Sequence, residues 1–274
     1  MTTVIDGSGT LRAHCLLCPN PGPMTLSGTN TWVLREPGAD RVVVVDPGPQ
    51  DERHLERVAR SVQEQGARVV LTLLTHGHPD HSEGARYFSE LTGAPVHAVD
   101  PRLGIAGEGQ DATLTDGQEF EVDGLHLRIL ETPGHTPDSV CVQVGADDVL
   151  LTGDTVLGQG TTVITEDGLG AYLDSLRRLR DLVAASGIRA LLPGHGPICP
   201  DPAQRLTEYL THREQRLEQV SAAVAAGAQE LRGVVARVYG DLDPALVPAA
   251  ESSVRAQLRY LAARGEVPAE LARS

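Results

Sequence analysis

A dense cluster of metal-binding side chains constrains this chain more than any other feature. Residues 69–74 form an apolar run, and the residues after it read THGHPDH. Within six residues this segment offers four ligands, His76, His78, Asp80 and His81. Imidazole binds zinc well, and a carboxylate adds negative charge that helps to hold a second cation. An uninterrupted apolar strand suits a sheet covered on both faces. The sequence therefore predicts a metal site at the C-terminal end of a buried strand in an α/β protein.

Three further ligand candidates stand at the ends of later predicted strands. They are His135, Asp154 and His195, and each directly follows a glycine. Any one of them alone is a weak signal, because a single histidine is more often structural than a ligand. Together with the first cluster they make a set of seven, and a His-rich surface loop explains such a set poorly.

The periodicity of apolar residues predicts two kinds of organisation along the chain. Up to about residue 200, short strands alternate with helices; beyond it, helix-forming residues dominate. We expect strands over residues 41–46, 69–74, 95–99, 119–122, 125–130, 139–144, 149–152 and 189–192. We expect helices over residues 51–65, 82–91, 170–183, 204–226, 229–239 and 248–264.

The charge of the chain is unevenly distributed. The formal net charge is −14, and the nine Arg and nine Asp and Glu after residue 203 cancel, so the acidic excess lies in the strand-containing part. Proteins that track a phosphate backbone usually carry a basic patch. Arg255, Arg259 and Arg264 on the last predicted helix are the only hint of one. A lid over the site or a contact within a homodimer suits this neutral tail better than DNA binding.

Neither the cysteines nor the hydropathy pattern points to a special compartment. Cys15 and Cys18 form a lone C-x-x-C without a second pair, so we interpret them as two incidental thiols and not as a zinc or redox site. No stretch approaches about 18 apolar residues, so no membrane association is expected. The N-terminus lacks a signal-peptide pattern, and we expect a cytoplasmic protein.

These motifs resemble the metallo-β-lactamase superfamily over about residues 28–200. The resemblance implies an αββα sandwich of two sheets with helices outside, and a site that holds two metal ions. It implies one ion on His76, His78 and His135, a second on Asp80, His81 and His195, and Asp154 as the bridge. It also implies that Asp46 supports the site by orienting a ligand, as carboxylates behind metal-bound histidines do.

A closer resemblance is to the β-lactamase-like protein 2 family. It rests on GTNTW at residues 28–32, on TGDTVLGQGTTV at 152–163, on LPGHGP at 192–197 and on the helical tail. That family implies a metal domain over residues 1–200 and a small winged-helix-like domain over 201–274. Its animal member is a single-stranded RNA endonuclease, whereas similar fungal proteins are thioesterases that act on a carrier-linked polyketide. True β-lactamases of the superfamily lack the bridging aspartate, which argues against antibiotic destruction.

Two bound divalent ions would lower the pKa of a water toward about 7 and bridge the resulting hydroxide. We therefore expect a dinuclear hydrolase that acts on an ester, thioester or related carbonyl compound, small or carrier-linked. Asp154 and Asp80 are the expected catalytic carboxylates, Asp80 as a proton acceptor. Single-stranded RNA is the alternative substrate, and a scaffold or DNA-binding regulator with a structural metal site is a third hypothesis. Two zinc ions are expected, although iron and manganese accept the same ligands.

Substrate contacts are less clearly marked in the sequence. Gly160 and Thr161, just beyond Asp154, can offer backbone N–H groups and a hydroxyl to an anionic substrate, or they can form a turn stabilised by threonine. Asn30 and Thr31 are further candidates for the lining of the cleft. We interpret Tyr172 as helix packing rather than a substrate contact.

Overall fold

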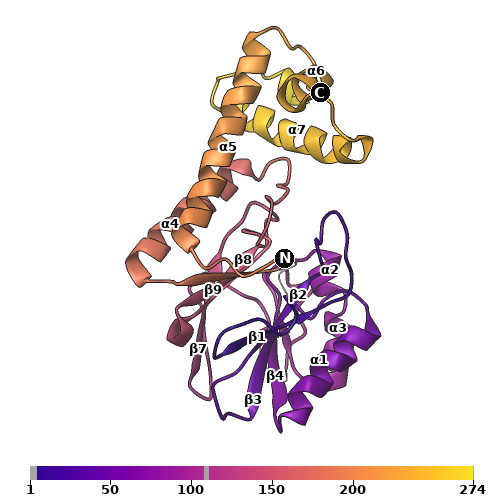
Figure 1. Ribbon diagram of the computed structural model, residues 1–274, viewed down its shortest axis with the longest axis vertical. Coiled ribbons are helices and arrows are strands. Elements are labelled where there is room, and N and C mark those ends of the chain that lie inside the picture. Colours follow the sequence, from indigo (N-terminus) through magenta and orange to yellow (C-terminus); the bar gives the residue numbers. More distant parts are fainter. Residues whose placement is uncertain (1–4, 108–110, 274) are drawn as a thin grey trace.

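The computed structural model describes residues 5–107 and 111–273. Two five-stranded sheets pack face to face, helices cover their outer faces, and a helical tail extends beyond them (Figure 1). The αββα sandwich expected from the resemblance is confirmed. Among the described residues, no helix combines the length and the apolar character needed to cross a bilayer.

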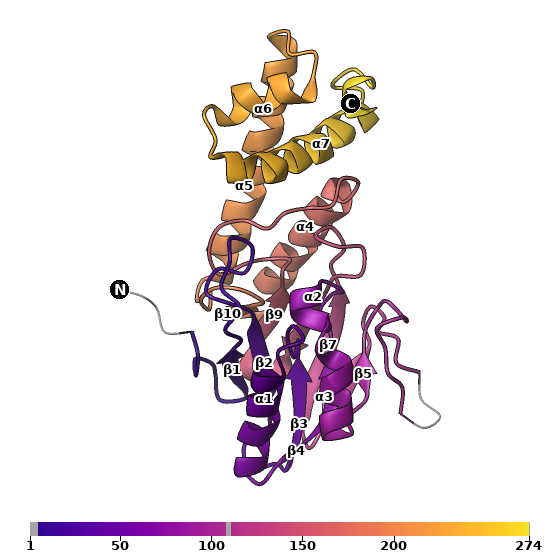
Figure 2. The ribbon, with the colours of Figure 1, turned by 90° about the vertical axis from the view of Figure 1, so that its right-hand side faces the viewer.

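The first sheet has the strand order β1-β2-β3-β4-β5. Strands β3 and β4 run parallel and are almost entirely buried, as their apolar sequences predicted. Figure 2 shows the two helices α1 and α3 across the outer face of this sheet. The elements are β1 (Ala13–Leu17), β2 (Asn30–Leu34), β3 (Arg41–Val45), α1 (Glu52–Glu64), β4 (Arg68–Leu73), α2 (Pro79–Ser82), α3 (Ala85–Thr92) and β5 (Val96–His97).

The second sheet has the strand order β10-β9-β8-β7-β6. Helix α4 covers its outer face with a buried stripe that includes Leu173, Leu176 and Leu179. The inner faces of the two sheets share one apolar core of mostly valine and leucine side chains. The elements are β6 (Glu119–Val122), β7 (Leu125–Glu131), β8 (Val140–Val144), η1 (Gly145–Asp147), β9 (Val149–Gly153), α4 (Leu169–Ser186) and β10 (Ala190–Pro193).

The helical tail comprises α5 (Pro202–Ala225), α6 (Leu231–Tyr239), η2 (Pro244–Leu246), α7 (Val247–Ala263) and η3 (Leu271–Arg273). Helix α5 belongs to two cores. Leu206 and Tyr209 pack with α4 on the sandwich, whereas Val220 and Ala223 pack with α6 and α7. A boundary between residues 200 and 201 stays a prediction, because the long helix joins both parts.

Three sequence-based assignments differ from the structure. Strands β1 and β2 were not expected, because polar Asn30 and Thr31 interrupt the apolar pattern of β2. The helix predicted over residues 82–91 is divided into α2 and α3 at Gly84, where an added Cβ would lie 2.6 Å from the Pro49 carbonyl oxygen. The strand predicted over 95–99 is reduced to β5, which pairs over only two residues.

Candidate metal centre

The predicted ligands come from loops at one edge of the sandwich. Those loops follow β4, β7, β9 and β10, and Asp46 directly follows β3. The carboxyl ends of neighbouring parallel strands meet at the same sheet edge, which brings together residues far apart in the sequence. All seven predicted ligands lie in two adjoining groups.

The first group consists of His76, His78, His135 and Asp154. Nδ1 of His78 lies 3.1 Å from Nε2 of His76 and 2.9 Å from Nε2 of His135. Three ring nitrogens therefore converge on one point.

The second group consists of Asp80, His81 and His195. Nε2 of His195 lies 3.1 Å from Nε2 of His81 and 3.1 Å from Oδ2 of Asp80. Both rings are almost fully buried, whereas the Asp80 side chain is 27% exposed and faces the cleft described below. This group can bind a cation and still leave a side open to a ligand.

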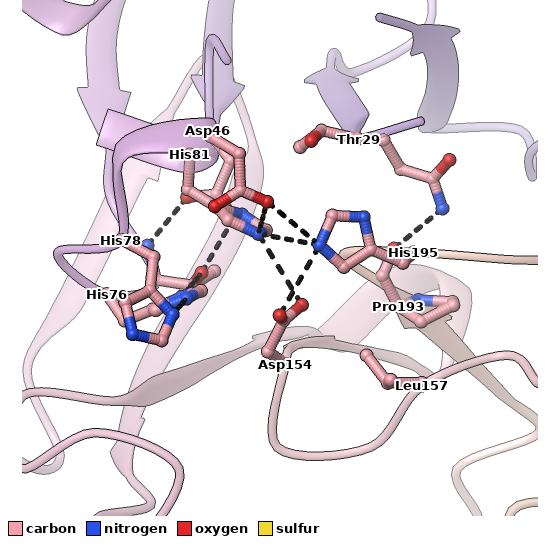
Figure 3. Close-up of polar contacts among 12 residues, drawn as sticks. Thr29, Asp46, His76, His78, His81, Asp154, Leu157, Pro193 and His195 are labelled. Carbon is pink, nitrogen blue, oxygen red and sulfur yellow. Dashed lines mark hydrogen bonds and ion pairs between the residues drawn. The ribbon is translucent and has the colours of Figure 1, made fainter. Parts of the chain in front are cut away.

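Asp154 lies between the two groups (Figure 3). Its Oδ2 is 3.7 Å from Nε2 of His135 and 3.4 Å from Nε2 of His195. Its Oδ1 is buried without a hydrogen-bond partner in the part of the chain that the structure describes. The Asp154 carboxylate is therefore within reach of ligand atoms of both groups.

Hydrogen bonds to Asp46 and Thr75 orient the rings of His76 and His81. Asp46 accepts the Thr75 backbone N–H at 2.7 Å and the Thr75 hydroxyl at 2.6 Å. The Thr75 oxygen is then free to accept Nδ1–H of His76 at 3.0 Å. Asp46 also accepts Nδ1–H of His81 at 2.8 Å. One buried carboxylate thus contacts both rings from the side away from the site, directly or through Thr75, and donation to it would leave Nε2 of each ring as the free donor atom.

The later histidines are oriented by backbone carbonyls. Nδ1–H of His135 donates to the Val163 oxygen at 2.6 Å, and Nδ1–H of His195 donates to the Gly28 oxygen at 3.1 Å. His78 differs, because its Nδ1 itself faces the other rings. Four rings therefore offer Nε2 and one offers Nδ1.

The site is strongly polarised by its buried charges. Burial opposes the charged form of His195, but without a cation the hydrogen bonds to Asp154 and Asp80 raise the pKa of its imidazole to about 10. A bound cation would displace that proton from Nε2. Burial also works against ionised Asp154, yet His81 and His195 hold the pKa of that carboxyl well below its usual range. Ionised carboxylates at this depth need a positive partner, which a divalent cation would supply.

The residues present fit a divalent metal. A tetrahedral zinc site with bonds of about 2.0–2.1 Å separates neighbouring nitrogens by about 3.3 Å, close to the spacings in both groups. The ligand side chains crowd position 194, where a Cβ would lie 2.6 Å from Oδ1 of Asp154 and 2.7 Å from Cε1 of His81. The His and Asp cluster is thus suited to divalent metal binding.

A cleft of about 490 Å³ opens onto both groups. Among the described residues that line it, none is an arginine, and much of the wall is apolar. Apart from the metal-site residues His78, Asp80, His135, Asp154 and His195, the lining is Pro23, Met24, Leu26, Leu157, Gln159, Gly160, Thr161, Thr162, Val163, Ile164, Thr165 and Ser252.

The candidate substrate contacts divide into two pairs. Gly160 and Thr161 line the cleft. Asn30 and Thr31 are fully buried and lie outside the lining. The Asn30 amide donates to the carbonyls of Pro193 and Gly196 at 2.9 Å each, so it holds the loop that carries His195.

Sequence reasoning missed the supporting role of two segments. In residues 28–32, the Gly28 carbonyl orients His195 and the Trp32 indole donates to the Pro193 carbonyl at 3.0 Å. In residues 162–163, the Thr162 hydroxyl and the Val163 carbonyl both contact Nδ1 of His135. Both segments belong to the sequence motifs on which the family resemblance rests. Those motifs were the signal that could have indicated the supporting role.

Other residues singled out in the sequence have structural surroundings. Burial raises the pKa of the Cys15 and Cys18 thiols to about 12, and both are free cysteines. Tyr172 is fully buried, and its hydroxyl donates to the Thr155 carbonyl. Arg255 and Arg259 pair with Glu166, and Arg264 pairs with Glu266.

Residues 24–195 match the family model of the metallo-β-lactamase superfamily. The chain belongs to this superfamily. Residues 231–272 match the β-lactamase-associated winged helix domain, so the tail carries a winged-helix domain after the metallo-β-lactamase fold.

Characterised relatives extend the similarity over most of the chain. Lactamase-like protein adaB of Aspergillus niger is 37% identical over 213 residues, which cover 76% of this chain and 62% of the fungal protein. The atrochrysone carboxyl ACP thioesterase of Aspergillus fumigatus is 35% identical over 81% of this chain and 68% of its own length. The β-lactamase-like protein 2 homologue of Caenorhabditis elegans is 30% identical over 92% of this chain and 84% of its own.

Solved structures share the fold over nearly the whole chain. A metallo-β-lactamase family protein from Thermus thermophilus superposes with a TM-score of 0.74 at 26% identity, covering 92% of this chain and 94% of that one. A β-lactamase domain protein from Burkholderia ambifaria gives a TM-score of 0.78 at 23% identity, covering 96% of this chain and 90% of that one.

Proposed function

We propose that this metallo-β-lactamase-fold hydrolase is dinuclear and that it cleaves an ester, a thioester or a related carbonyl compound. The observation that carries the proposal is that both ligand groups face one largely apolar cleft. No arginine is among the described residues that line this cleft. A carbonyl substrate needs no cationic groove, whereas a polyanion does. The similarity to a fungal ACP thioesterase supports a thioester in particular.

We assign the seven ligands to two ions, zinc being the best match for their chemistry. His76, His78 and His135 would hold the first, and Asp80, His81 and His195 the second, with Asp154 shared. Bound there, two divalent ions would supply a hydroxide nucleophile and polarise the carbonyl oxygen. Iron and manganese accept the same donors.

The side chains around the ligands have distinct roles in this proposal. Asp80 is the most exposed carboxylate of the two groups, so it is the one able to accept a proton from water or return it to the leaving group. Asp154 is too deeply buried to exchange a proton with water or the leaving group. In this proposal it holds the two groups in a fixed relative position. Leu26, Leu157 and Ile164 line the cleft and restrict water around an acyl chain.

Single-stranded RNA cleavage is the second candidate. The similarity to β-lactamase-like protein 2 homologues over 92% of the chain favours it, because the family resemblance implies that activity. The acidic balance of the chain and the cleft lining weigh against it.

The deciding experiment offers the zinc-loaded protein a panel of thioesters and a labelled single-stranded RNA. We expect thioester hydrolysis that disappears in Asp154→Ala, together with intact RNA. RNA cuts that disappear in the same variant, with no thioester hydrolysis, would replace our proposal by the nuclease function. Activity that persists in Asp154→Ala would identify a contaminant or a different site.

A further inference from the structure

A second, smaller pocket adjoins the catalytic cleft. It has a volume of about 230 Å³ and lies against helices α5, α6 and α7. Thr161, Thr162 and Val163 line both cavities, so one short backbone segment separates them. We call this cavity the side pocket. The rest of its lining is His212, Arg213, Arg216, Tyr239, Leu246, Ala249, Ala250 and Ser253.

Arg213 in the side pocket is a buried cation without a carboxylate partner among the residues that the structure describes. Its side chain is 5% exposed, and among the described residues no other arginine is buried. One guanidinium nitrogen donates to the Thr162 carbonyl, and the group lies 5.3 Å from the centre of the Tyr172 ring. Its Nε has no hydrogen-bond partner in the described structure. A buried charge in this state is costly unless an anion joins it.

A second arginine and a buried histidine lie beside Arg213 in the side pocket. Arg216 lies 4.5 Å above the Tyr239 ring and donates to the Gln219 side chain, and it forms no ion pair with the described residues. Nδ1 of His212 is buried and has no partner among them. No described residue of the lining is acidic, although the chain carries a formal charge of −14. Arginines elsewhere on the tail, such as Arg255 and Arg259, are paired with carboxylates.

We propose that the side pocket binds a phosphate ester on the leaving group of the substrate. This inference rests on the proposed thioesterase function. The planar guanidinium matches phosphate oxygens in pairs, and Thr161 and Ser253 add hydroxyls to the lining. One compact pocket suits a single phosphate, whereas a nucleic acid needs a row of such contacts.

The chemical class that fits is a thioester whose thiol is joined through an arm to a phosphate, as in phosphopantetheine. The carbonyl would lie in the cleft and the phosphate behind the segment 161–163. Hydrolysis forms a C–O bond from water and breaks the C–S bond. The products are a carboxylic acid and a thiol, and the phosphate ester is unchanged.

The test compares acetyl-4′-phosphopantetheine with acetyl-pantetheine, which differ only by the phosphate. For the metal-loaded protein we expect kcat/KM to favour the phosphorylated compound by about tenfold or more, mainly through KM, as charge-assisted hydrogen bonds would give. Arg216→Gln should lower this ratio by at least about threefold without abolishing it, because Arg213 remains in the side pocket. The matched control is Arg264→Gln, which removes a guanidinium that also lies over a tyrosine but lines neither cavity, and it should keep the ratio.

Calorimetric titration with 4′-phosphopantetheine and with pantetheine gives a readout independent of turnover. We expect only the phosphorylated compound to bind, and Arg216→Gln to weaken it about tenfold. Equal hydrolysis and equal binding of both compounds would overturn the side-pocket proposal and leave the thioesterase function standing. Hydrolysis of neither compound would overturn the proposed function.

Acetyl-coenzyme A and an acetylated carrier protein then distinguish the source of the phosphate arm. A preference for either one supports the proposal and identifies the carrier. Binding of a single-stranded RNA that depends on Arg216, with no binding of phosphopantetheine, would overturn it in favour of a nucleic-acid site.

Discussion

The two ligand groups of the candidate metal centre are held by different parts of the molecule. In the second group, His81 rests on Asp46 at the end of β3, and His195 rests on the Gly28 carbonyl just before β2. Both supports belong to the first sheet and are anchored by its buried strands. The histidines of the second group are therefore supported from the first sheet.

The first group depends on a loop as well, because only its His76 shares the Asp46 support, through Thr75. His135 is held by the carbonyl of Val163, within residues 158–168. That loop is in turn held by the tail, since Arg213 donates to the Thr162 carbonyl and Arg255 pairs with Glu166. The tail lies beyond the edge of the sandwich where the ligands gather (Figure 1). The contrast teaches that a change in the tail can reach one ligand group while leaving the other untouched.

The largest effect should come from Asp154→Ala, which removes the carboxylate shared by both groups. We expect both metal equivalents to weaken and kcat/KM to fall by more than about 100-fold, which is the upper range for residues that merely support ligands. Metal content per chain by emission spectrometry and thioester hydrolysis measure the two effects. If the variant retained full metal content and activity, the bridging assignment would be wrong.

Asp46→Asn should weaken the second group more than the first, because Asp46 contacts His81 directly but His76 only through Thr75. An amide cannot accept all three hydrogen bonds that the carboxylate receives, so His81 loses its fixed orientation. We expect the equivalent on His81 to bind about 10–100-fold more weakly, and the equivalent on His135, whose ring Asp46 does not contact, to weaken less. Competition with a chromophoric chelator resolves the two equivalents.

Asp123→Asn is the matched control for this variant. Asp123 has a φ of 52°, as Asp46 does, so both substitutions face the same backbone conformation. Asp123 pairs with Arg41, which belongs to neither ligand group. Equal weakening of both equivalents in Asp46→Asn would show that the groups are not independently supported.

Gly194→Ala adds a methyl group where the two ligand groups meet. The added Cβ would meet the side-chain ends of Asp154 and His81 at under 3 Å, so both ligands would have to shift. We expect a loss of about 1–3 kcal/mol in the free energy of unfolding and a fall of roughly tenfold in activity. Thermal unfolding and hydrolysis rates measure both. Gly145→Ala, where a Cβ meets nothing within 4 Å, should change neither.

The contrast between the groups also explains what the sequence could predict. The seven ligands were recognisable because each follows a strand and because strand ends meet at one edge of a sheet. The strands β3 and β4 were recognisable because their residues are uniformly apolar. These features are local, so sequence periodicity reports them.

The residues that support the ligands were not recognisable in the sequence, because tertiary contacts determine their positions. Strand β2 carries a buried asparagine that bonds to the loop of His195, so it does not read as an apolar strand. Gly84 divides a predicted helix because the Pro49 carbonyl approaches it. Arg213 is buried because α5 packs beside the loop 158–168. No local sequence pattern indicates this packing.

The smallest effect should come from Glu166→Gln, which loosens the contact between the tail and the loop that supports His135. Glu166 pairs with Arg255 and Arg259, each at 2.9 Å, but its side chain is 39% exposed. Ion pairs this exposed contribute less than about 1 kcal/mol each, so we expect the first equivalent to weaken by no more than about fivefold and the second not at all. The same chelator competition measures it, with Asp174→Asn on α4 as the control because Asp174 also pairs with an arginine but touches neither group. If Glu166→Gln weakened the second equivalent instead, the dependence of the first group on the tail would be refuted.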